Sequence, residues 1–187
     1  MLRILILLFI LPLLSCNEAS TKSRTATYAS NKYGTVSPYI RSFDSYYYRF
    51  KGGTLPINNL KITMVKSLSN SQAIGTCHSI SKEIKILESY WTRASDSQKK
   101  LLIYHELAHC YLNRPHKSEL VNGIPVSIMY PSNIHREHFK AFESMYVEEL
   151  FTNNSSNIER TLANYSASIP RIMDSESDQD HFICKHE

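Results

Sequence analysis

The sequence predicts an α+β domain with an N-terminal helix, a small mixed sheet, a central helix and a C-terminal helix. Apolar residues recur at spacings of three and four after Pro38 and again after Asn133, as on one face of a helix. Between these segments lie three short apolar runs typical of strands, followed by a capping signal and a further apolar repeat. Strands grouped together and flanked by helices favour the α+β class.

The N-terminal segment 1–16 predicts a bacterial lipoprotein signal peptide. Arg3 supplies a positive charge, and the apolar run 4–14 that follows is too short for a permanent membrane span. Leu13-Leu14-Ser15-Cys16 resembles a lipobox, in which the cysteine is lipidated and becomes the mature N-terminus. The alternative is an ordinary signal peptide in which Cys16 is incidental.

The rest of the chain divides into a tether and one domain. Residues 17–36 are rich in Ser, Thr, Asn and Ala, which predicts a flexible tether. Residues 37–187 are long enough for a single domain with a hydrophobic core, although the tail after about residue 152 has a weak pattern. The net charge of +4 is small and the basic residues are scattered, so we expect no nucleic-acid partner.

The first helix is predicted after Pro38 and before Gly52-Gly53, two signals typical of helix ends. Its apolar stripe consists of Ile40, Phe43, Tyr47 and Phe50. The run 46–48 contains three tyrosines and is compatible with a strand, but the helical spacing favours the helix.

Three segments, 60–65, 74–80 and 84–87, predict the strands of the sheet. Ser95 and Gln98 then form a capping box that begins the central helix, and Pro115 ends it. One stripe of this helix is expected to face inward; it comprises Leu101, His105, Ala108 and Leu112. A last helix is expected over 133–151, with a buried stripe of Phe139, Phe142, Tyr146 and Leu150.

The central helix carries an H-E-x-x-H motif made by His105, Glu106 and His109. Histidines four apart lie on one face of a helix, so both imidazoles can reach one ion. Glu106 beside the first histidine is placed to accept a proton from water bound to that ion. This arrangement is typical of zinc-dependent peptidases.

A catalytic zinc usually takes three protein ligands, and His116 is the strongest candidate for the third. Asn113 tolerates a left-handed backbone and Pro115 forbids a longer helix, so the chain can turn His116 back toward the ion. The alternative is that His116 is a surface loop histidine.

Other candidate donors follow the motif. His135 and His138 open the last helix, and Glu143 is the nearest match to the glutamate that serves as third ligand in another class of H-E-x-x-H enzymes. We expect the carboxylates of this region to be solvated residues on helix faces; they are Glu119, Glu143, Glu148 and Glu149.

The region resembles the metzincin zinc endopeptidases, whose motif H-E-x-x-H-x-x-G-x-x-H precedes a turn that contains methionine. In this chain the sequence of residues 105–116 is HELAHCYLNRPH, and Ser127-Ile128-Met129-Tyr130-Pro131 looks like the methionine turn. Leu112 occupies the glycine position and the third histidine falls one residue later, whereas Asn113 keeps the glycine-to-histidine spacing. Residues 37–150 also look like bacterial lipoproteins that carry an H-E-L-x-H-C motif.

This resemblance implies a metzincin-like fold and a Zn²⁺ cofactor held by His105, His109 and His116. Glu106 would activate zinc-bound water for hydrolysis of a protein or peptide substrate, and Met129 would pack beneath the ligands. Tyr130 is expected to be a packed aromatic rather than an oxyanion donor. A strand within 74–87 would form the cleft edge and bind the peptide as an added strand.

The predicted function is therefore a zinc metallopeptidase (an endopeptidase) of the bacterial cell envelope. The N-terminal lipid would hold it on the membrane, on the periplasmic or outer-surface side. Two alternatives remain: a zinc-binding lipoprotein without catalysis, and a zinc amidase acting on cell-wall peptide.

Export implies an oxidising compartment, in which Cys77, Cys110 and Cys184 can form disulfides. A bond between Cys77 and Cys110 is expected, with a buried free thiol at position 110 as the alternative.

Overall fold

A computed structural model describes residues 34–165 of the chain. The predicted signal peptide 1–16 with Cys16, most of the tether 17–36, and Cys184 lie outside the described residues. The elements, in chain order, are η2 (Gly34–Val36), α1 (Ser37–Lys51), η3 (Ile57–Asn59), β1 (Lys61–Val65), β2 (Gly75–His78), β3 (Glu83–Leu87), α2 (Glu88–Arg93), α3 (Asp96–Leu107), the π-helical turn η4 (Ala108–Leu112), β4 (Leu120–Val121), β5 (Ile124–Pro125), α4 (Arg136–Thr152) and α5 (Ser156–Tyr165).

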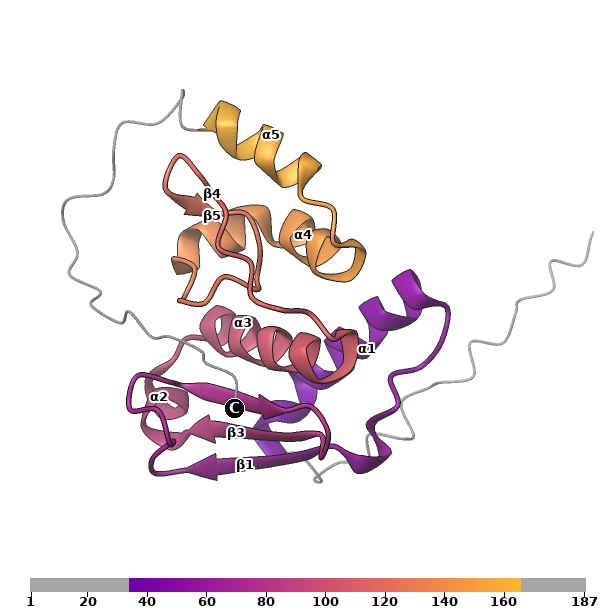
Figure 1. The fold of residues 1–187 in the computed structure, drawn as a ribbon, viewed down its shortest axis with the longest axis vertical. Helices are drawn as coiled ribbons and strands as arrows, with labels where there is room; N and C mark the ends of the chain where they lie inside the picture. The colour runs from indigo at the N-terminus through magenta and orange to yellow at the C-terminus, as the bar shows by residue number, and fades with distance from the viewer. Residues whose placement is uncertain (1–33, 166–187) are drawn as a thin grey trace, which may run out of the picture.

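The fold is α+β, as the sequence predicts, and α3 is its central element. The three-stranded sheet lies on one side of α3, while α4, the short hairpin β4–β5 and α5 lie on the other (Figure 1). Helix α1 contacts both α3 and α4. The predicted inward stripe is buried at Leu101, His105 and Ala108 and half-buried at Leu112, but burial extends to every residue from Leu101 to Cys110. The reason is that layers on both sides cover the helix, which periodicity within one segment does not reveal.

Helix α1 confirms the helical interpretation of the first segment. Pro38 stands in the first turn, where its missing N–H costs no hydrogen bond. Gly52 ends the helix in a left-handed conformation, with φ 75°, and donates its N–H to the carbonyl of Tyr48. Ile40 and Phe43 are fully buried and pack into the core, so the tyrosine run forms part of a helix and not of a strand.

The sheet is mixed and has the order β1–β3–β2. β1 pairs with β3 in parallel, and β2 pairs with β3 in antiparallel register, with Cys77 opposite Ile84. Alternation along the strands buries Gly75 and Cys77 toward α3 and places Thr76 and His78 on the opposite face. Within residues 34–165, β2 is therefore an edge strand that lies beside the motif helix.

Helix α3 begins with the predicted capping box. The side chain of Ser95 accepts a hydrogen bond from the backbone N–H of Gln98, and the Gln98 side chain accepts one from the N–H of Ser95. This reciprocal pair determines the residue at which the helix starts. It therefore also determines the direction in which the later histidines point.

Four of the α-helices and β-strands were not predicted from the sequence: α2, β4, β5 and α5. α2 is a short helix, and the hairpin β4–β5 turns at Asn122-Gly123, both with positive φ. That dipeptide is a strong hairpin signal that the sequence interpretation left unused. Helix α5 lies in the tail after residue 152, where we expected only a weak pattern, and it buries Ile158 and Leu162, four positions apart.

Helix α4 matches the last predicted helix, and its four predicted core residues are buried. Tyr146 donates a 2.7 Å hydrogen bond to the carbonyl of Pro125 and thus anchors the hairpin; burial raises the pKa of this phenol, so the hydroxyl keeps its proton. Among the helices formed by residues 34–165, none combines the length and the apolar character that a membrane span requires.

Candidate metal centre

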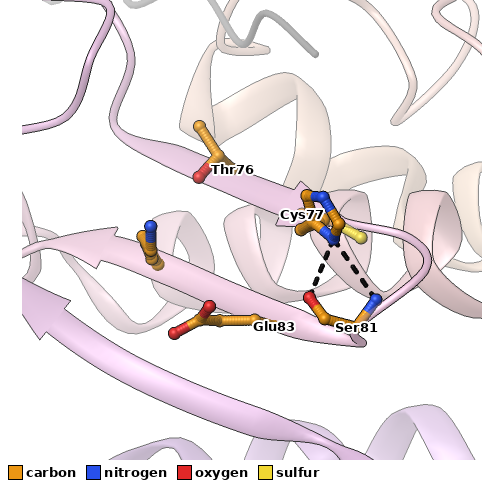
Figure 2. Close-up of a pocket in the computed structure, with 6 residues that line it drawn as sticks. Thr76, Cys77, Ser81 and Glu83 are labelled. Carbon is orange, nitrogen blue, oxygen red and sulfur yellow. Dashed lines mark hydrogen bonds between the residues drawn. The ribbon is translucent and has the colours of Figure 1, made fainter. Parts of the chain in front are cut away.

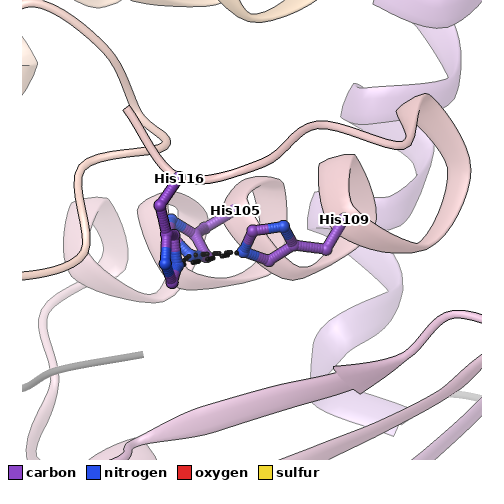
Figure 3. Close-up of side chains that lie close together, drawn as sticks. All are labelled: His105, His109 and His116. Carbon is purple, nitrogen blue, oxygen red and sulfur yellow. Dashed lines mark hydrogen bonds between the residues drawn. The ribbon is translucent and has the colours of Figure 1, made fainter. Parts of the chain in front are cut away.

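The side chains of His105, His109 and His116 converge on one point (Figure 3). The Nε2 atoms of His105 and His109 are 2.9 Å apart, and each is 3.2 Å from Nε2 of His116. The two helical rings are buried, with 4% of their surface exposed, and His116 is half-buried. Among the described residues, this trio is the group of His, Cys, Asp or Glu side chains whose geometry is compatible with a metal site.

A π-helical turn accommodates the extra residue between the second and third histidines. Helix α3 passes into η4, where Asn113 donates its N–H to the carbonyl of Ala108, five residues earlier. A π turn holds one residue more than an α turn. Asn113 then leaves the helix with φ 52° and ψ 38°, the left-handed conformation that the sequence predicts. His116 consequently lies beside the helical histidines despite its later position.

Backbone carbonyls determine which ring nitrogen of the two helical histidines carries a proton. Nδ1 of His105 lies 2.8 Å from the carbonyl of Ile128, and Nδ1 of His109 lies 2.6 Å from the carbonyl of Arg114. A carbonyl can only accept, so each Nδ1 carries a proton; in a neutral ring the Nε2 atom then presents its lone pair to a cation.

The donor set fits a small divalent cation. Two Nε2 lone pairs at 2.9 Å repel unless something positive lies between them. In tetrahedral zinc coordination, with Zn–N distances near 2.05 Å, the ligand nitrogens are about 3.3 Å apart. The observed separations of 2.9 to 3.2 Å are close to this spacing, so the residues present suit the metal.

Glu106 is the buried acid of the motif, with 1% of its surface exposed. It lies against the edge strand: a Cβ atom added to Gly75 would stand 2.9 Å from its Oε1 and 2.8 Å from Cδ1 of Leu102. Only glycine lets the carboxylate and the strand approach so closely. Gly75 is thus part of the site, and the sequence motif alone did not reveal it.

We expect Gly75→Ala to lower the free energy of unfolding by about 1–3 kcal/mol, the usual effect of overpacking a filled interior. The new methyl group would have to displace Leu102 or Glu106, which are both buried. Gly53→Ala is the matched control, because a Cβ there meets nothing within 4 Å. Urea unfolding of both variants measures the difference in the free energy of unfolding. Equal stability of the two variants would show that Gly75 is not required by its contacts with Leu102 and Glu106.

The predicted methionine turn lies next to the histidines. Met129 is fully buried, and the N–H of Tyr130 donates to the carbonyl of Ser127 to close the turn. The N–H of Lys117 donates to the carbonyl of Met129 at 2.9 Å, which ties the turn to the residue after His116. Tyr130 is half-buried and, with His105, lines a small pocket.

The alternative donors lie elsewhere. Glu143 pairs with Lys100 at 2.5 Å, and the rings of His135 and His138 contact each other edge-on with centroids 5.5 Å apart. Glu119 and Glu148 are exposed, as predicted. None of these side chains belongs to the histidine cluster of the described chain.

Glu149 corrects the prediction of a solvated carboxylate. Its side chain is completely buried, because its charge is matched within the core by Arg114 at 2.7 Å and Lys117 at 3.4 Å. The sequence held a signal for this burial: Glu149 lies seven residues after Phe142 and three after Tyr146, on the apolar stripe of α4.

Cys77 and Cys110 form a disulfide, with Cα atoms 5.9 Å apart. The bond joins the edge strand to η4, one residue after His109. Lys82, after β2, donates from Nζ to the carbonyl of Cys110 and reinforces this junction.

A second pocket lies over the sheet strands β2 and β3 (Figure 2). There Nδ1 of His78 accepts from the N–H of Ser81 at 3.2 Å and lies 2.8 Å from its hydroxyl. His78 is an exposed residue on the face of the sheet opposite α3. This histidine therefore stabilises a turn and is separate from the metal centre.

The fold and the site together describe a metallopeptidase-like protein. Residues 61–143 match the model of a family described as "Putative phage metallopeptidase". The matched region contains the sheet, the histidine cluster, Glu106 and Met129, and it ends before Glu149. The comparison with curated proteins gives no match, and neither does the comparison with solved structures.

Proposed function

We propose that this protein is a zinc-dependent endopeptidase, metzincin-like in its ligand set, that works in the bacterial cell envelope. The observation that carries the proposal is the convergence of three imidazole Nε2 atoms within 2.9 to 3.2 Å, at a helix in which the buried Glu106 directly follows His105. A purely structural zinc site has no need of an acid next to its ligands. The similarity to a metallopeptidase family supports peptide-bond hydrolysis.

His105, His109 and His116 would hold the ion and leave its fourth position for water or substrate. Bound zinc supplies a Lewis acid that polarises the peptide carbonyl and makes water more acidic. Glu106 accepts the proton of the attacking water and returns it to the leaving amine. The Nδ1 hydrogen bonds to the carbonyls of Ile128 and Arg114 keep the two helical rings aimed at the ion.

The position of β2 at the edge of the sheet favours an extended peptide as the substrate. β2 pairs with β3 on one side, and no strand pairs with its other side within residues 34–165. The main chain of β2 can therefore hydrogen-bond to an added strand. Gly75 brings Glu106 against this strand, so a peptide bound there would run close to the proton acceptor.

The proposed location is the envelope surface, with the lipid on Cys16 anchored in the membrane and residues 17–36 as a tether. The disulfide between Cys77 and Cys110 supports an exported protein, because such bonds persist in oxidising compartments.

The test compares zinc content and proteolysis in the wild-type full chain and in His109→Ala. We expect about one equivalent of zinc in the wild type, cleavage of dye-quenched casein, and at least about 100-fold weaker zinc binding in the variant. Changes outside the ligand shell alone cost about 10- to 100-fold, so loss of a ligand should cost more. Elemental analysis after dialysis measures the metal.

His135→Ala is the matched control, since this exposed histidine lies outside the cluster. Retention of a full equivalent of zinc by His109→Ala would refute the ligand set. Zinc binding without cleavage of casein would favour the two alternatives, and hydrolysis of cell-wall peptide would separate the amidase from the non-catalytic lipoprotein.

A further inference from the structure

We propose that Glu149 is a positioning residue of the metal centre: its carboxylate holds the two backbone segments whose carbonyls orient His105 and His109. The inference rests on the metal site of the proposed function. It assigns a role to a buried acid that the hydrolytic step does not use and that lies beyond residues 61–143, which match the family described as "Putative phage metallopeptidase".

Both carboxylate oxygens of Glu149 are engaged. Oε1 accepts from Nη2 of Arg114 at 2.7 Å and from Nζ of Lys117 at 3.4 Å. Oε2 accepts from the hydroxyl of Ser127 at 2.5 Å. These three partners come from the two loops that carry the site: Arg114 and Lys117 flank His116, and Ser127 opens the methionine turn.

The first connection leads to His109. Nη1 of Arg114 donates to the carbonyls of Glu149 and Leu150 at 2.9 and 2.7 Å, so both ends of the guanidinium are fixed to α4. The backbone carbonyl of Arg114 accepts from Nδ1 of His109 at 2.6 Å. Glu149 thus holds the residue whose carbonyl sets the orientation of the second ligand.

The second connection leads to His105. The hydroxyl of Ser127 donates to Glu149 and accepts from the N–H of Met129 at 3.0 Å. It therefore joins Glu149 to the backbone of the turn. Within that turn, the carbonyl of Ile128 lies 2.8 Å from Nδ1 of His105. Glu149 therefore also holds the segment that orients the first ligand.

The charge of Glu149 matters as well as its shape. Arg114 and Lys117 place two positive charges on the loop that carries His116, and Glu149 is the acid paired with both. Without this carboxylate, two buried or half-buried cations would remain near a site that takes a dication. Loss of the network should therefore weaken metal binding even though no ligand is removed.

The test measures zinc affinity of the metal-free full chain by competition with a chromophoric chelator, together with the visible spectrum of the Co²⁺-loaded protein. We expect Glu149→Gln to bind zinc about 10- to 100-fold more weakly, the usual effect of losing a partner outside the ligand shell. The cobalt spectrum should shift, because the ligand geometry changes. Glu148→Gln is the matched control, since its exposed side chain lies one position away on the same helix.

Removing one member of a buried ion pair can unfold a protein, so Ser127→Ala serves as the second variant. It retains the charges and removes the hydroxyl that joins Glu149, at 2.5 Å, to the N–H of Met129, at 3.0 Å. We expect a smaller loss of zinc affinity and a cobalt shift in the same direction. If Glu149→Gln does not fold, Ser127→Ala decides the question alone.

Wild-type affinity and an unchanged cobalt spectrum in the folded variants would overturn the proposal, even if their stability falls, because the network would then be structural only. A wild type that binds zinc but cleaves no peptide refutes the peptidase and leaves the comparison of Glu149 variants valid. A wild type that binds no zinc overturns both proposals.

Discussion

Replacing Glu106 by glutamine is expected to lower kcat/KM for dye-quenched casein by about 10²- to 10⁴-fold, the usual contribution of a general base. Glutamine has nearly the same shape, so the contacts of Glu106 with Leu102 and Gly75 should persist. It cannot accept the proton from the attacking water. Zinc content should stay at the wild-type level, because position 106 is not part of the three-histidine cluster.

The control for this prediction is Glu119→Gln, which removes an exposed carboxylate that follows the motif. It should cleave casein at the wild-type rate. A Glu106→Gln variant that keeps its zinc and its full rate would eliminate the catalytic role of the acid. A variant that loses its zinc would instead indicate that Glu106 organises the ligands.

The sequence was sufficient to locate the histidine cluster because its geometry is mostly local. His105 and His109 share a helix face by spacing alone, and Asn113 and Pro115 mark the turn that brings back His116. The one irregularity, the extra residue before the turn, is absorbed by the π-helical turn η4. That a helix can lengthen one turn in this way follows from backbone geometry, but no residue type in 108–112 signals it.

The parts that sequence reasoning missed depend on contacts between distant segments. Glu149 is buried because Arg114, 35 residues away, and Ser127, 22 residues away, meet it in the core. A glutamate is almost never buried without a partner, so its place on the apolar stripe of α4 could not predict burial until Arg114 and Ser127 were known to meet it. Gly75 is similar, because the need for glycine arises from Leu102 and Glu106 on another element.

The short elements were missed by the sequence analysis for a different reason. β4 and β5 contain two residues each, below the length at which alternation can be recognised. Helix α5 does carry an amphipathic pattern, with Ile158, Leu162 and Tyr165 at helical spacing, which the sequence interpretation left unused; this face packs on α4 and β4.

Removal of the disulfide by the double substitution Cys77→Ala and Cys110→Ala is expected to lower the free energy of unfolding by about 3–4 kcal/mol. The bond closes a loop with a sequence separation of 33 residues, and opening it increases the entropy of the unfolded chain. Urea unfolding of metal-free protein measures the change. Chelation matters here, because zinc bound to the folded state alone would add its own stabilisation and conceal part of the loss.

The wild type treated with a reducing agent supplies the matched comparison. It should lose the same free energy as the double variant, whereas the double variant should not respond to the reductant. A double variant as stable as the oxidised wild type would contradict the assignment of this disulfide. Because Cys110 follows His109 directly, the reduced protein should also bind zinc more weakly, as η4 would be released from the edge strand.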